Sequence, residues 1–326
     1  MKKILVTGAA GFIGSSLTRS LLRLGHEVRG VDNLSTGRMS NLADVLPELQ
    51  FVEGDLQDAP LMQDLCSGVD LIFHEGALPS VPKSIADPRA SHLSNVEGTL
   101  SLLLAAREQG VQRVVYAASS SAYGESDTLP KHEAMPTAPI SPYAVQKLSG
   151  ELYMQSFAQV YGMETVCLRY FNVFGPFQAA DSPYSGVLAK FITNMLTGRP
   201  VTIFGDGSQS RDFTYIDNVV QANLLAGSAT ARKVSGKVYN VACGKRYSLL
   251  ETHRILRELL NCKEAPLFGP TRPGDILHSL ADIRKAKQDL GYEPTVDFTE
   301  GLRRTVDWYA LQKDVALTPA ASGALV

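Results

Sequence analysis

The sequence KILVTGAAGFIG, residues 3–14, decides the fold that we predict for the whole chain. A short apolar run that suits a buried strand is followed at once by three glycines spaced three apart, Gly8, Gly11 and Gly14. Apolar residues then recur at helical spacing, so a helix begins at this turn. Glycines let the backbone approach a ligand closely, and free N–H groups at a helix start attract an anion. The stretch therefore predicts a site for a dinucleotide pyrophosphate.

An acidic residue after the second predicted strand supports the same ligand. Residues 27–31 suit a strand, and Asp32 follows, eighteen residues beyond Gly14. A carboxylate there can accept hydrogen bonds from both hydroxyls of an adenosine ribose, and its charge repels a 2′-phosphate, so we expect NAD rather than NADP. The polar loop 33–38 should lie beside the adenosine. The alternative is a glycine turn that only joins a strand to a helix, and strand, turn, helix and acid together argue against it.

Composition excludes several classes of function. The chain has 326 residues, of which 44% are hydrophobic and 20% charged, so it can bury a large core and suggests two domains. The net charge of −2, without Lys/Arg clusters interleaved with aromatics, argues against nucleic-acid binding. No apolar run is long enough to cross a membrane, and the amino terminus starts a strand where a signal peptide would stand, so we expect a cytoplasmic protein. The four cysteines and six histidines lack the spacing of a metal site, and we predict no metal.

Strands and helices alternate up to about residue 172. We expect strands at 50–54, 70–74, 113–118 and 165–169, and helices at 61–65, 89–109 and from Ser141, which precedes a proline. This alternation predicts an α/β protein with a Rossmann-type, doubly wound parallel sheet. Beyond it the pattern loosens. There we expect a helix at 186–196, a short strand at 200–204, and helices at 249–260 and 282–290.

We expect the chain to divide near residue 172. Residues 1–172 would form the NAD-binding Rossmann domain, together with a return segment of about 213–242 in which 214–226 and 238–241 rejoin the large sheet. Residues 173–212 and 243–313 would form a smaller C-terminal α/β substrate domain. Residues 314–326 would form a frayed tail.

A tyrosine and a lysine share one face of the helix that starts at Ser141. Tyr143 and Lys147 are four residues apart, hence neighbours on the helix surface. An unperturbed tyrosine has a pKa of about 10. The Lys147 ammonium and the positive nicotinamide ring of NAD⁺ could lower it if both lie close, so that the phenol acts as a base. By itself such a pair is more often a packed ring and a solvated charge.

Three serines follow the predicted strand 113–118. Ser119, Ser120 and Ser121 stand where loops at the ends of parallel strands bind ligands. A hydroxyl there could donate a hydrogen bond to the substrate oxygen that Tyr143 deprotonates. We favour Ser119, which is nearest the strand. Serine is also a common turn former, and whether Ser120 and Ser121 share this hydrogen bond stays open.

These motifs, taken in order, resemble those of the extended short-chain dehydrogenase/reductase family, in its nucleotide-sugar branch. The motifs are Gly8-x-x-Gly11-x-x-Gly14, Ser119-Ser120-Ser121, Tyr143-x-x-x-Lys147 and Arg169-Tyr170-Phe171-Asn172. Within that branch the chain is most similar to UDP-hexose 4-epimerases, particularly bacterial enzymes acting on UDP-N-acetylglucosamine, through residues 80–84, 141–145, 211–213 and 272–275. The similarity runs from Lys3 to about Trp308.

The resemblance implies a reaction. Tyr143 would take the proton of the sugar 4-hydroxyl while hydride leaves C4 for tightly held NAD⁺, and the 4-keto sugar would turn over and receive the hydride on its other face. Ser119, Tyr143 and Lys147 would be the catalytic residues. Arg211 and Arg272 would bind the pyrophosphate, Asp275 the ribose or uridine, and Asn172 the diphosphate.

The motifs and the resemblance together give two sets of binding residues. Those expected to contact NAD are Gly8, Gly11, Phe12, Ile13, Gly14, Asp32, Asn33, Ser35, Thr36, Gly37, Asp55, Leu56, Ala77, Asn95, Tyr143, Lys147, Tyr170 and Val173. Those expected to contact the UDP-sugar are Ser80, Ser119, Ser121, Tyr143, Asn172, Arg211, Arg272, Asp275 and Ser279.

Ser279 is the residue from which we predict the sugar. The resemblance places it beside the C2 substituent, where a bulky aromatic residue excludes an N-acetyl group and a small residue leaves room. Serine is small, so we expect interconversion of UDP-GlcNAc and UDP-GalNAc. We also expect UDP-glucose and UDP-galactose to be accepted, since a roomy pocket discriminates poorly against a smaller ligand.

Other functions remain open. A UDP-glucuronate 4-epimerase or decarboxylase would share the fold and the Tyr/Lys pair, and Lys83 could bind its carboxylate. A dehydratase would carry an Asp-Glu pair where Ser120 and Ser121 stand. A non-catalytic NAD-binding regulator would be expected to lose Tyr143 or Lys147. We also expect a homodimer, in which the helices at 89–109 and 143–161 pair with their copies in a four-helix bundle.

Overall fold

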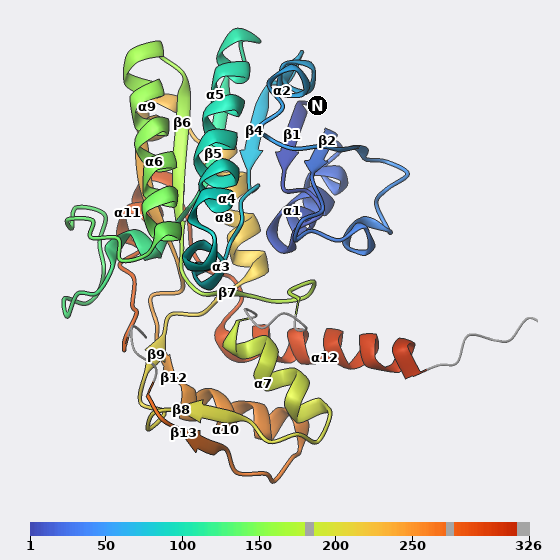
Figure 1. The fold of residues 1–326 in the computed structure, drawn as a ribbon, viewed down its shortest axis with the longest axis vertical. Helices are drawn as coiled ribbons and strands as arrows, with labels where there is room; N and C mark the ends of the chain where they lie inside the picture. The colour runs from blue at the N-terminus through green and yellow to red at the C-terminus, as the bar shows by residue number, and fades with distance from the viewer. Residues whose placement is uncertain (180–185, 272–276, 318–326) are drawn as a thin grey trace, which may run out of the picture.

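The computed structural model describes residues 1–179, 186–271 and 277–317, with side chains described up to residue 312. Seven parallel strands form its main sheet, in the order β11-β6-β5-β4-β1-β2-β3 (Figure 1). The strands are β1 (Lys3–Thr7), β2 (Glu27–Asp32), β3 (Gln50–Glu53), β4 (Leu71–His74), β5 (Arg113–Ser119), β6 (Glu164–Tyr170) and β11 (Lys237–Val241). The predicted Rossmann-type sheet is confirmed. Because the order reverses between β1 and β4, the chain leaves a crevice at the carboxyl ends of these strands.

Helices cover both faces of the sheet, as the alternating side chains of the strands require. Ile4 and Val6 point into the cluster covered by α1 (Phe12–Arg23) and α8 (Ile216–Ser228). Leu5 points into the opposite cluster, covered by α2 (Ala59–Cys66), α5 (Gly98–Glu108) and α6 (Pro142–Tyr161). Both faces of each central strand are thus buried, which accounts for its continuous apolar run.

The helix predicted at 89–109 is interrupted. The structure has α3 (Val81–Ala86) and α4 (Pro88–His92), then a π-helical turn at Leu93–Glu97, and then α5. Asn95, in that turn, accepts a hydrogen bond from Leu78 N at 2.6 Å and donates one to Gln146 Oε1 at 2.9 Å. These long-range bonds favour the wider turn, and apolar periodicity carries no sign of them.

The expected return of residues 214–226 to the large sheet is corrected. Residues 214–215 form β10, which pairs with β7 (Val173–Phe174), and residues 216–226 belong to α8, which packs on the sheet. Within the return segment, only β11 is a strand of the seven-stranded sheet. The apolar residues of 216–226 recur at spacings of three and four, which suits a helix lying on a sheet.

Short strands and helices form the rest of the described structure. Strand β8 (Thr202–Phe204) pairs with β13 (Leu267–Gly269), and β9 (Ser210–Arg211) with β12 (Tyr247–Ser248). The helices are α7 (Val187–Leu196), α9 (Ala231–Val234), α10 (Leu249–Leu260), α11 (Arg284–Leu290) and α12 (Phe298–Leu317). Helix α12 continues to Leu317, past the residue where the frayed tail was expected to begin, and 318–326 lie outside the described residues.

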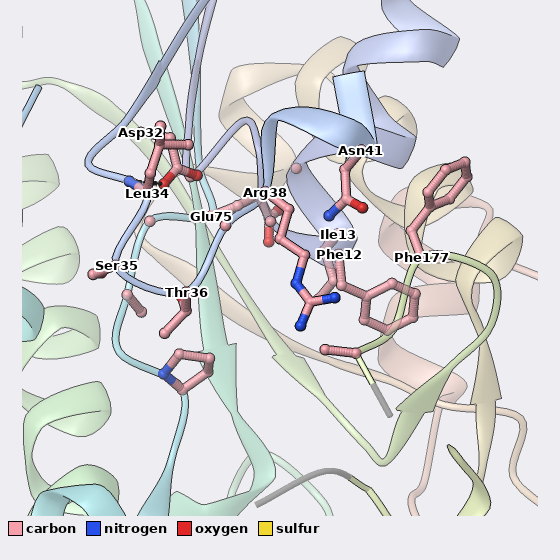
Figure 2. Close-up of a pocket in the computed structure, with 18 of the residues that line it drawn as sticks. Phe12, Ile13, Asp32, Leu34, Ser35, Thr36, Arg38, Asn41, Glu75 and Phe177 are labelled. Atoms are coloured by element: carbon pink, nitrogen blue, oxygen red, sulfur yellow. Dashed lines mark hydrogen bonds between the residues drawn. The ribbon is translucent and has the colours of Figure 1, made fainter. Parts of the chain in front are cut away.

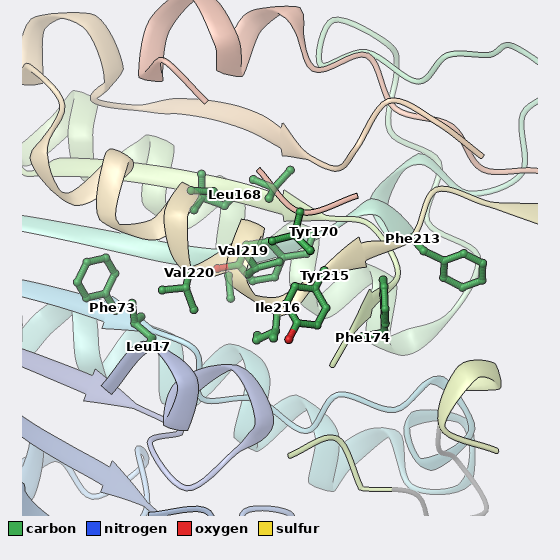
Figure 3. Close-up of a cluster of buried hydrophobic side chains, with 14 of the residues drawn as sticks. Leu17, Phe73, Leu168, Tyr170, Phe174, Phe213, Tyr215, Ile216, Val219 and Val220 are labelled. Carbon is green, nitrogen blue, oxygen red and sulfur yellow. The ribbon is translucent and has the colours of Figure 1, made fainter. Parts of the chain in front are cut away.

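One apolar cluster runs from the sheet into this second part (Figure 3). Leu17, Phe73 and Leu168 belong to it at the sheet, and Phe174 and Phe213 belong to it at the far end. The rings of Phe174 and Phe213 meet edge to face with centroids 6.2 Å apart. The two parts thus share a continuous core, which fixes the crevice between them. Within the described ranges, no helix has both the length and the apolar character that crossing a bilayer requires.

Candidate active site

The glycine turn after β1 lines a cleft of about 1050 Å³ (Figure 2). A Cβ at Gly14 would lie 2.0 Å from the carbonyl oxygen of Gly8. The strand, the turn and the helix can therefore pack this closely only if residue 14 is glycine. Helix α1 has Gly11 as its N-cap and no side-chain cap. Its first-turn N–H groups are therefore available to an anion in the cleft, as the sequence predicts.

Asp32 ends β2 and lines the same cleft. Its carboxylate accepts hydrogen bonds from Ala10 N at 3.0 Å and Leu34 N at 2.8 Å. Burial raises the pKa of Asp32, and the N–H groups of Leu34, Ala10 and Gly11 oppose that rise. Two residues beyond the end of β3, Asp55 accepts a hydrogen bond from Asn33 Nδ2 at 2.8 Å. Two carboxylates thus face the space expected for the adenosine.

Most of the residues expected to contact NAD line this cleft. They are Gly8, Gly11, Phe12, Ile13, Gly14, Asp32, Asn33, Ser35, Thr36, Gly37, Asp55, Leu56, Ala77 and Val173. Asn95, Tyr143, Lys147 and Tyr170 do not belong to its wall. Asn95 is 1% exposed and is bonded to Leu78 and Gln146, so it supports the turn beside the cleft.

The structure brings the three predicted catalytic residues together. Ser119 is the last residue of β5, and Tyr143 is the second residue of α6, whose N-cap Ser141 accepts a hydrogen bond from Ala144 N. A Cβ at Gly150 would lie 2.3 Å from Tyr116 Oη, so glycine lets α6 approach β5 closely. As a result the Ser119 hydroxyl is hydrogen-bonded to the Tyr143 phenol.

The serine cluster is linked by its own hydrogen bonds. Ser121 donates to Ser119 Oγ from its hydroxyl at 2.8 Å and from its backbone N–H at 3.2 Å. With two bonds accepted, the Ser119 hydroxyl keeps its hydrogen to donate toward Tyr143. Ser121 thus orients Ser119, and Ser120 begins the 3-10 turn Ser120–Tyr123.

Lys147 lies one turn beyond Tyr143 on α6 and is 4% exposed. Its Nζ stands 4.5 Å from the centroid of the Tyr116 ring. Burial lowers the pKa of Lys147 to about 8, while the nearby Glu75 carboxylate opposes that fall. Burial also raises the pKa of Tyr143 above its ordinary value, and the hydrogen bond from Ser119 opposes the rise. The protein's own charges therefore do not produce the lowered Tyr143 pKa that was expected of Lys147 and the nicotinamide ring acting together.

Glu75 places in the cleft a carboxyl group that is not among the residues predicted from the sequence (Figure 2). It follows β4 and accepts a hydrogen bond from Tyr170 Oη at 2.8 Å, and Asn223 Nδ2 donates to the same Tyr170 hydroxyl at 2.8 Å. Burial raises the pKa of Glu75 to about 7, opposed by the Tyr170 hydrogen bond and by Lys147. Its place directly after a predicted strand was the one signal that could have found it.

Two of the residues expected at the sugar nucleotide contact each other. Asn172, at φ +34°, donates from Nδ2 to Asp212 O and to Ser279 Oγ, both at 3.0 Å. Ser279 Oγ also accepts a hydrogen bond from Asp212 N at 3.3 Å. Both Nδ2 hydrogens of Asn172 are thus used within the protein, so its side chain has no donor left for a diphosphate. Ser279 keeps one hydroxyl hydrogen to donate.

The remaining substrate residues are only partly described. Ser80 caps α3, lines the cleft and accepts a hydrogen bond from Lys83 N at 3.2 Å. Arg211 ends β9, and its Nη1 donates to the carbonyl groups of Ser210 and Leu277. Arg272 and Asp275 lie outside the described residues. In the described part of the chain, no three His, Cys, Asp or Glu side chains gather to hold a metal ion.

The cleft extends beyond the residues that the sequence suggested. Its further wall comes from the segment beyond the predicted loop 33–38, from the segment after β7 and from α12, through Ser40, Asn41, Phe177, Gln178, Trp308, Tyr309 and Gln312. Helix α12 lies far along the chain from the glycine turn, and no motif marks these positions. Only the folded chain brings them to the cofactor cleft.

The chain is similar to proteins of known sequence and structure. The sequence profile of the NAD dependent epimerase/dehydratase family matches residues 4–242. A UDP-glucose 4-epimerase of Mycolicibacterium smegmatis is 39% identical over 311 residues, which are 94% of this chain and 98% of that protein.

Solved structures agree with this match. A UDP-N-acetylglucosamine 4-epimerase from Methanobrevibacter ruminantium, in complex with UDP-N-acetylmuramic acid, is 40% identical with a TM-score of 0.91, covering 95% of this chain and 99% of that one. The Thermus thermophilus UDP-glucose 4-epimerase in complex with NAD is 35% identical with a TM-score of 0.85, covering 94% and 98%.

Proposed function

The chain belongs to the NAD-dependent epimerase/dehydratase family, among its UDP-sugar 4-epimerases, and we propose that it interconverts UDP-GlcNAc with UDP-GalNAc and UDP-glucose with UDP-galactose. The observation that carries the proposed chemistry is the contact between Ser119 and Tyr143 at the ends of β5 and α6, with Lys147 one turn away. Beside these catalytic residues of the NAD-binding part, we assign the remaining UDP-sugar contacts to a substrate domain formed by residues 173–212 and 243–313.

The proposed reaction begins with proton transfer at the sugar 4-hydroxyl. Tyr143 Oη takes that proton as the C4–O bond becomes a carbonyl, and Ser119 donates a hydrogen bond to the same oxygen. Bound NAD⁺ supplies the hydride acceptor at C4 and afterwards the hydride donor. The Lys147 ammonium supplies positive charge that favours the Tyr143 phenolate. In the return half, Tyr143 gives the proton back to the oxygen of the rotated 4-keto sugar.

The choice of acetylated sugars rests on Ser279. Its side chain is small and is held against Asn172 and the backbone of Asp212. A small residue at this position leaves space for an N-acetyl group, and its remaining hydroxyl hydrogen can donate to the acetyl carbonyl oxygen. This supports acceptance of both acetylated and plain hexoses.

A substrate panel tests the proposal. The purified protein is incubated separately with UDP-GlcNAc, UDP-GalNAc, UDP-glucose, UDP-galactose and UDP-glucuronate, without added reductant, and the epimer ratio is measured. We expect both hexosamine and both hexose substrates to approach an equilibrium mixture. Turnover of the hexoses alone would contradict the proposed sugar.

The fifth substrate, UDP-glucuronate, distinguishes the proposed activity from a second candidate function, which is action on a uronate. Lys83 lines the cleft, and its ammonium could bind a uronate carboxylate. Loss of CO₂ from UDP-glucuronate, or its conversion to the C4 epimer, would favour a uronate-acting enzyme. No turnover of any substrate would favour a non-catalytic NAD-binding regulator.

A Tyr143→Phe variant tests whether Tyr143 is the base in any turnover that is observed. Phenylalanine keeps the ring but has no hydroxyl to move a proton, so we expect turnover to fall by about 10²-fold or more. Bound NAD, measured after release by acid, should stay at the wild-type level. Turnover at the wild-type rate would contradict the mechanism.

A further inference from the structure

Three side chains from distant segments meet beside the cofactor cleft: Arg19 of α1, Phe177 after β7 and Trp308 of α12. The guanidinium carbon of Arg19 lies 4.0 Å from the Phe177 ring centroid, and the Phe177 and Trp308 centroids are 5.2 Å apart. We term these three residues the aromatic clasp. Phe177 lines the cleft together with Phe12, at the start of the helix that carries Arg19, and Figure 2 shows these two rings. Trp308 lines the same cleft.

The cationic member of the clasp is held in place. Arg19 is 6% exposed, and its Nε and Nη2 donate to the two carboxylate oxygens of Asp44 at 2.8 and 2.5 Å. Its Nη1 donates to Ser15 O at 3.2 Å, and its Nη2 also donates to Asn41 O. The guanidinium is therefore fixed by bonds in its own plane, which leaves one face for the Phe177 ring.

The aromatic members tie α12 to the segment after β7. Phe177 adopts φ +68°, a left-handed conformation that is unfavourable for a residue with a Cβ. A backbone in this region persists only where its surroundings hold it, and here Arg19 and Trp308 hold the ring. Next to Trp308, the Tyr309 hydroxyl donates to the carbonyl of Gln178. The clasp thus joins α1, which begins at the pyrophosphate site, to a helix near the end of the chain.

We propose that the aromatic clasp retains NAD in the cleft by joining α1 to α12 across its wall. Release of the dinucleotide then requires Phe177 to leave Arg19 and Trp308, so exchange with free NAD is slow. The inference concerns cofactor retention and does not depend on which sugar the protein uses.

The test measures exchange of bound NAD in the holoenzyme. The protein as purified is mixed with excess radiolabelled NAD, and label bound to protein is followed in time by gel filtration. In Phe177→Gly the ring is absent, while glycine adopts positive φ without strain, so the backbone keeps its conformation. We expect exchange to be about tenfold faster or more, the effect of losing a desolvated cation–π contact.

Two controls separate retention from packing. Leu311→Ala lies on the same helix at a position 63% exposed and should leave the exchange rate unchanged. Phe177→Tyr keeps the ring and should also keep the wild-type rate. If Phe177→Gly fails to fold, Trp308→Ala and Trp308→Phe replace it, and only the alanine variant should speed exchange.

Wild-type exchange in Phe177→Gly, or in Trp308→Ala where the glycine variant does not fold, would overturn the proposal. No sugar nucleotide enters this experiment. Its failure would therefore leave the proposed epimerisation untouched, and failure of the substrate panel would leave the clasp untouched.

Discussion

At the scale of single residues, Ser279, which we propose as the specificity position, also has a structural role. The sequence suggested only its size, whereas the structure shows its hydroxyl bonded to Asn172 Nδ2 and Asp212 N. Replacing it therefore changes the space beside the sugar and the anchoring of Asn172 together. Two substitutions are needed to separate these effects.

Ser279→Tyr should reduce turnover of UDP-GlcNAc and UDP-GalNAc much more than that of UDP-glucose and UDP-galactose. The phenol ring fills the space that we assign to the N-acetyl group, and a plain hydroxyl needs less room. Ser279→Ala is the matched control, because it removes the same hydrogen bonds without adding bulk. It should lower turnover of the acetylated pair only by the loss of the hydrogen bond to the acetyl carbonyl oxygen, and therefore much less than the tyrosine variant does. The measurement is kcat/KM for each pair, and equal losses in the tyrosine variant would contradict the assignment.

We expect Lys147 to limit the proposed activity at high pH. Its pKa is lowered to about 8, so the ammonium is present below that pH and is lost above it. Since we propose that this charge favours the Tyr143 phenolate once NAD⁺ is bound, we expect kcat/KM to fall as pH rises through 8, to about one tenth of its plateau a pH unit higher. Glu75→Gln removes a carboxylate that raises the pKa of Lys147, so its profile should fall at lower pH. A level profile up to pH 10 would contradict this role.

At the scale of elements, Asp212 connects segments that lie far apart in the chain. Its buried carboxylate accepts backbone hydrogen bonds from Cys243 N at 3.0 Å and from Gly244 N and Ala281 N, both at 3.1 Å. It thereby fixes the end of β9 against the segment after β11 and against the segment that carries Ser279. Burial raises its pKa to about 7, against these N–H donors.

Asp212→Asn should lower the free energy of unfolding by about 1–3 kcal/mol, because the amide offers one oxygen and turns its NH₂ toward backbone donors. Chemical denaturation of the holoenzyme measures the change. Asp206→Asn is the control, since Asp206 is exposed and its Oδ1 accepts from Ser208 N and Oγ, bonds that an asparagine oxygen can also accept. Equal stability of the two variants would contradict the anchoring role of Asp212.

The sequence predicts elements better than it predicts how they meet. The apolar runs of β1 to β6 and the spacing of α10 follow from periodicity alone, and the structure has these elements within a residue or two of the predicted limits, α10 with its predicted bounds. The π turn at Leu93–Glu97 depends on Asn95 bonding to Leu78 and Gln146, and β10 depends on β7, so neither has a local signal. The same holds for the cleft, where the glycine turn and Asp32 were predictable. Glu75 had only its place after a predicted strand as a signal, and Trp308 had none.

At the scale of the whole molecule, one face of α5 and α6 carries exposed apolar side chains. Val145, Leu152 and Val160 of α6 are 48%, 55% and 65% exposed, and Leu104 of α5 is 37% exposed. Such a face suits the four-helix packing of a homodimer that we expect from the resemblance.

Leu152→Glu should therefore shift the protein from dimer to monomer, because a carboxylate would be buried without a partner in the interface. Light scattering after gel filtration measures the mass at several protein concentrations. Leu250→Glu is the control on α10, where the leucine is 42% exposed, and it should leave the mass unchanged. A monomeric wild-type protein, or a dimeric Leu152→Glu variant, would contradict this interface.

Trp308 is the single tryptophan of the chain, and it lines the cofactor cleft. Tryptophan emits in the near ultraviolet, where reduced nicotinamide absorbs and oxidised nicotinamide does not. The intrinsic fluorescence of the unlabelled protein should therefore dim whenever the bound cofactor is reduced. The molecule thus carries a built-in optical probe of the redox state of its cofactor, and this probe would report the 4-keto intermediate of the proposed reaction in real time.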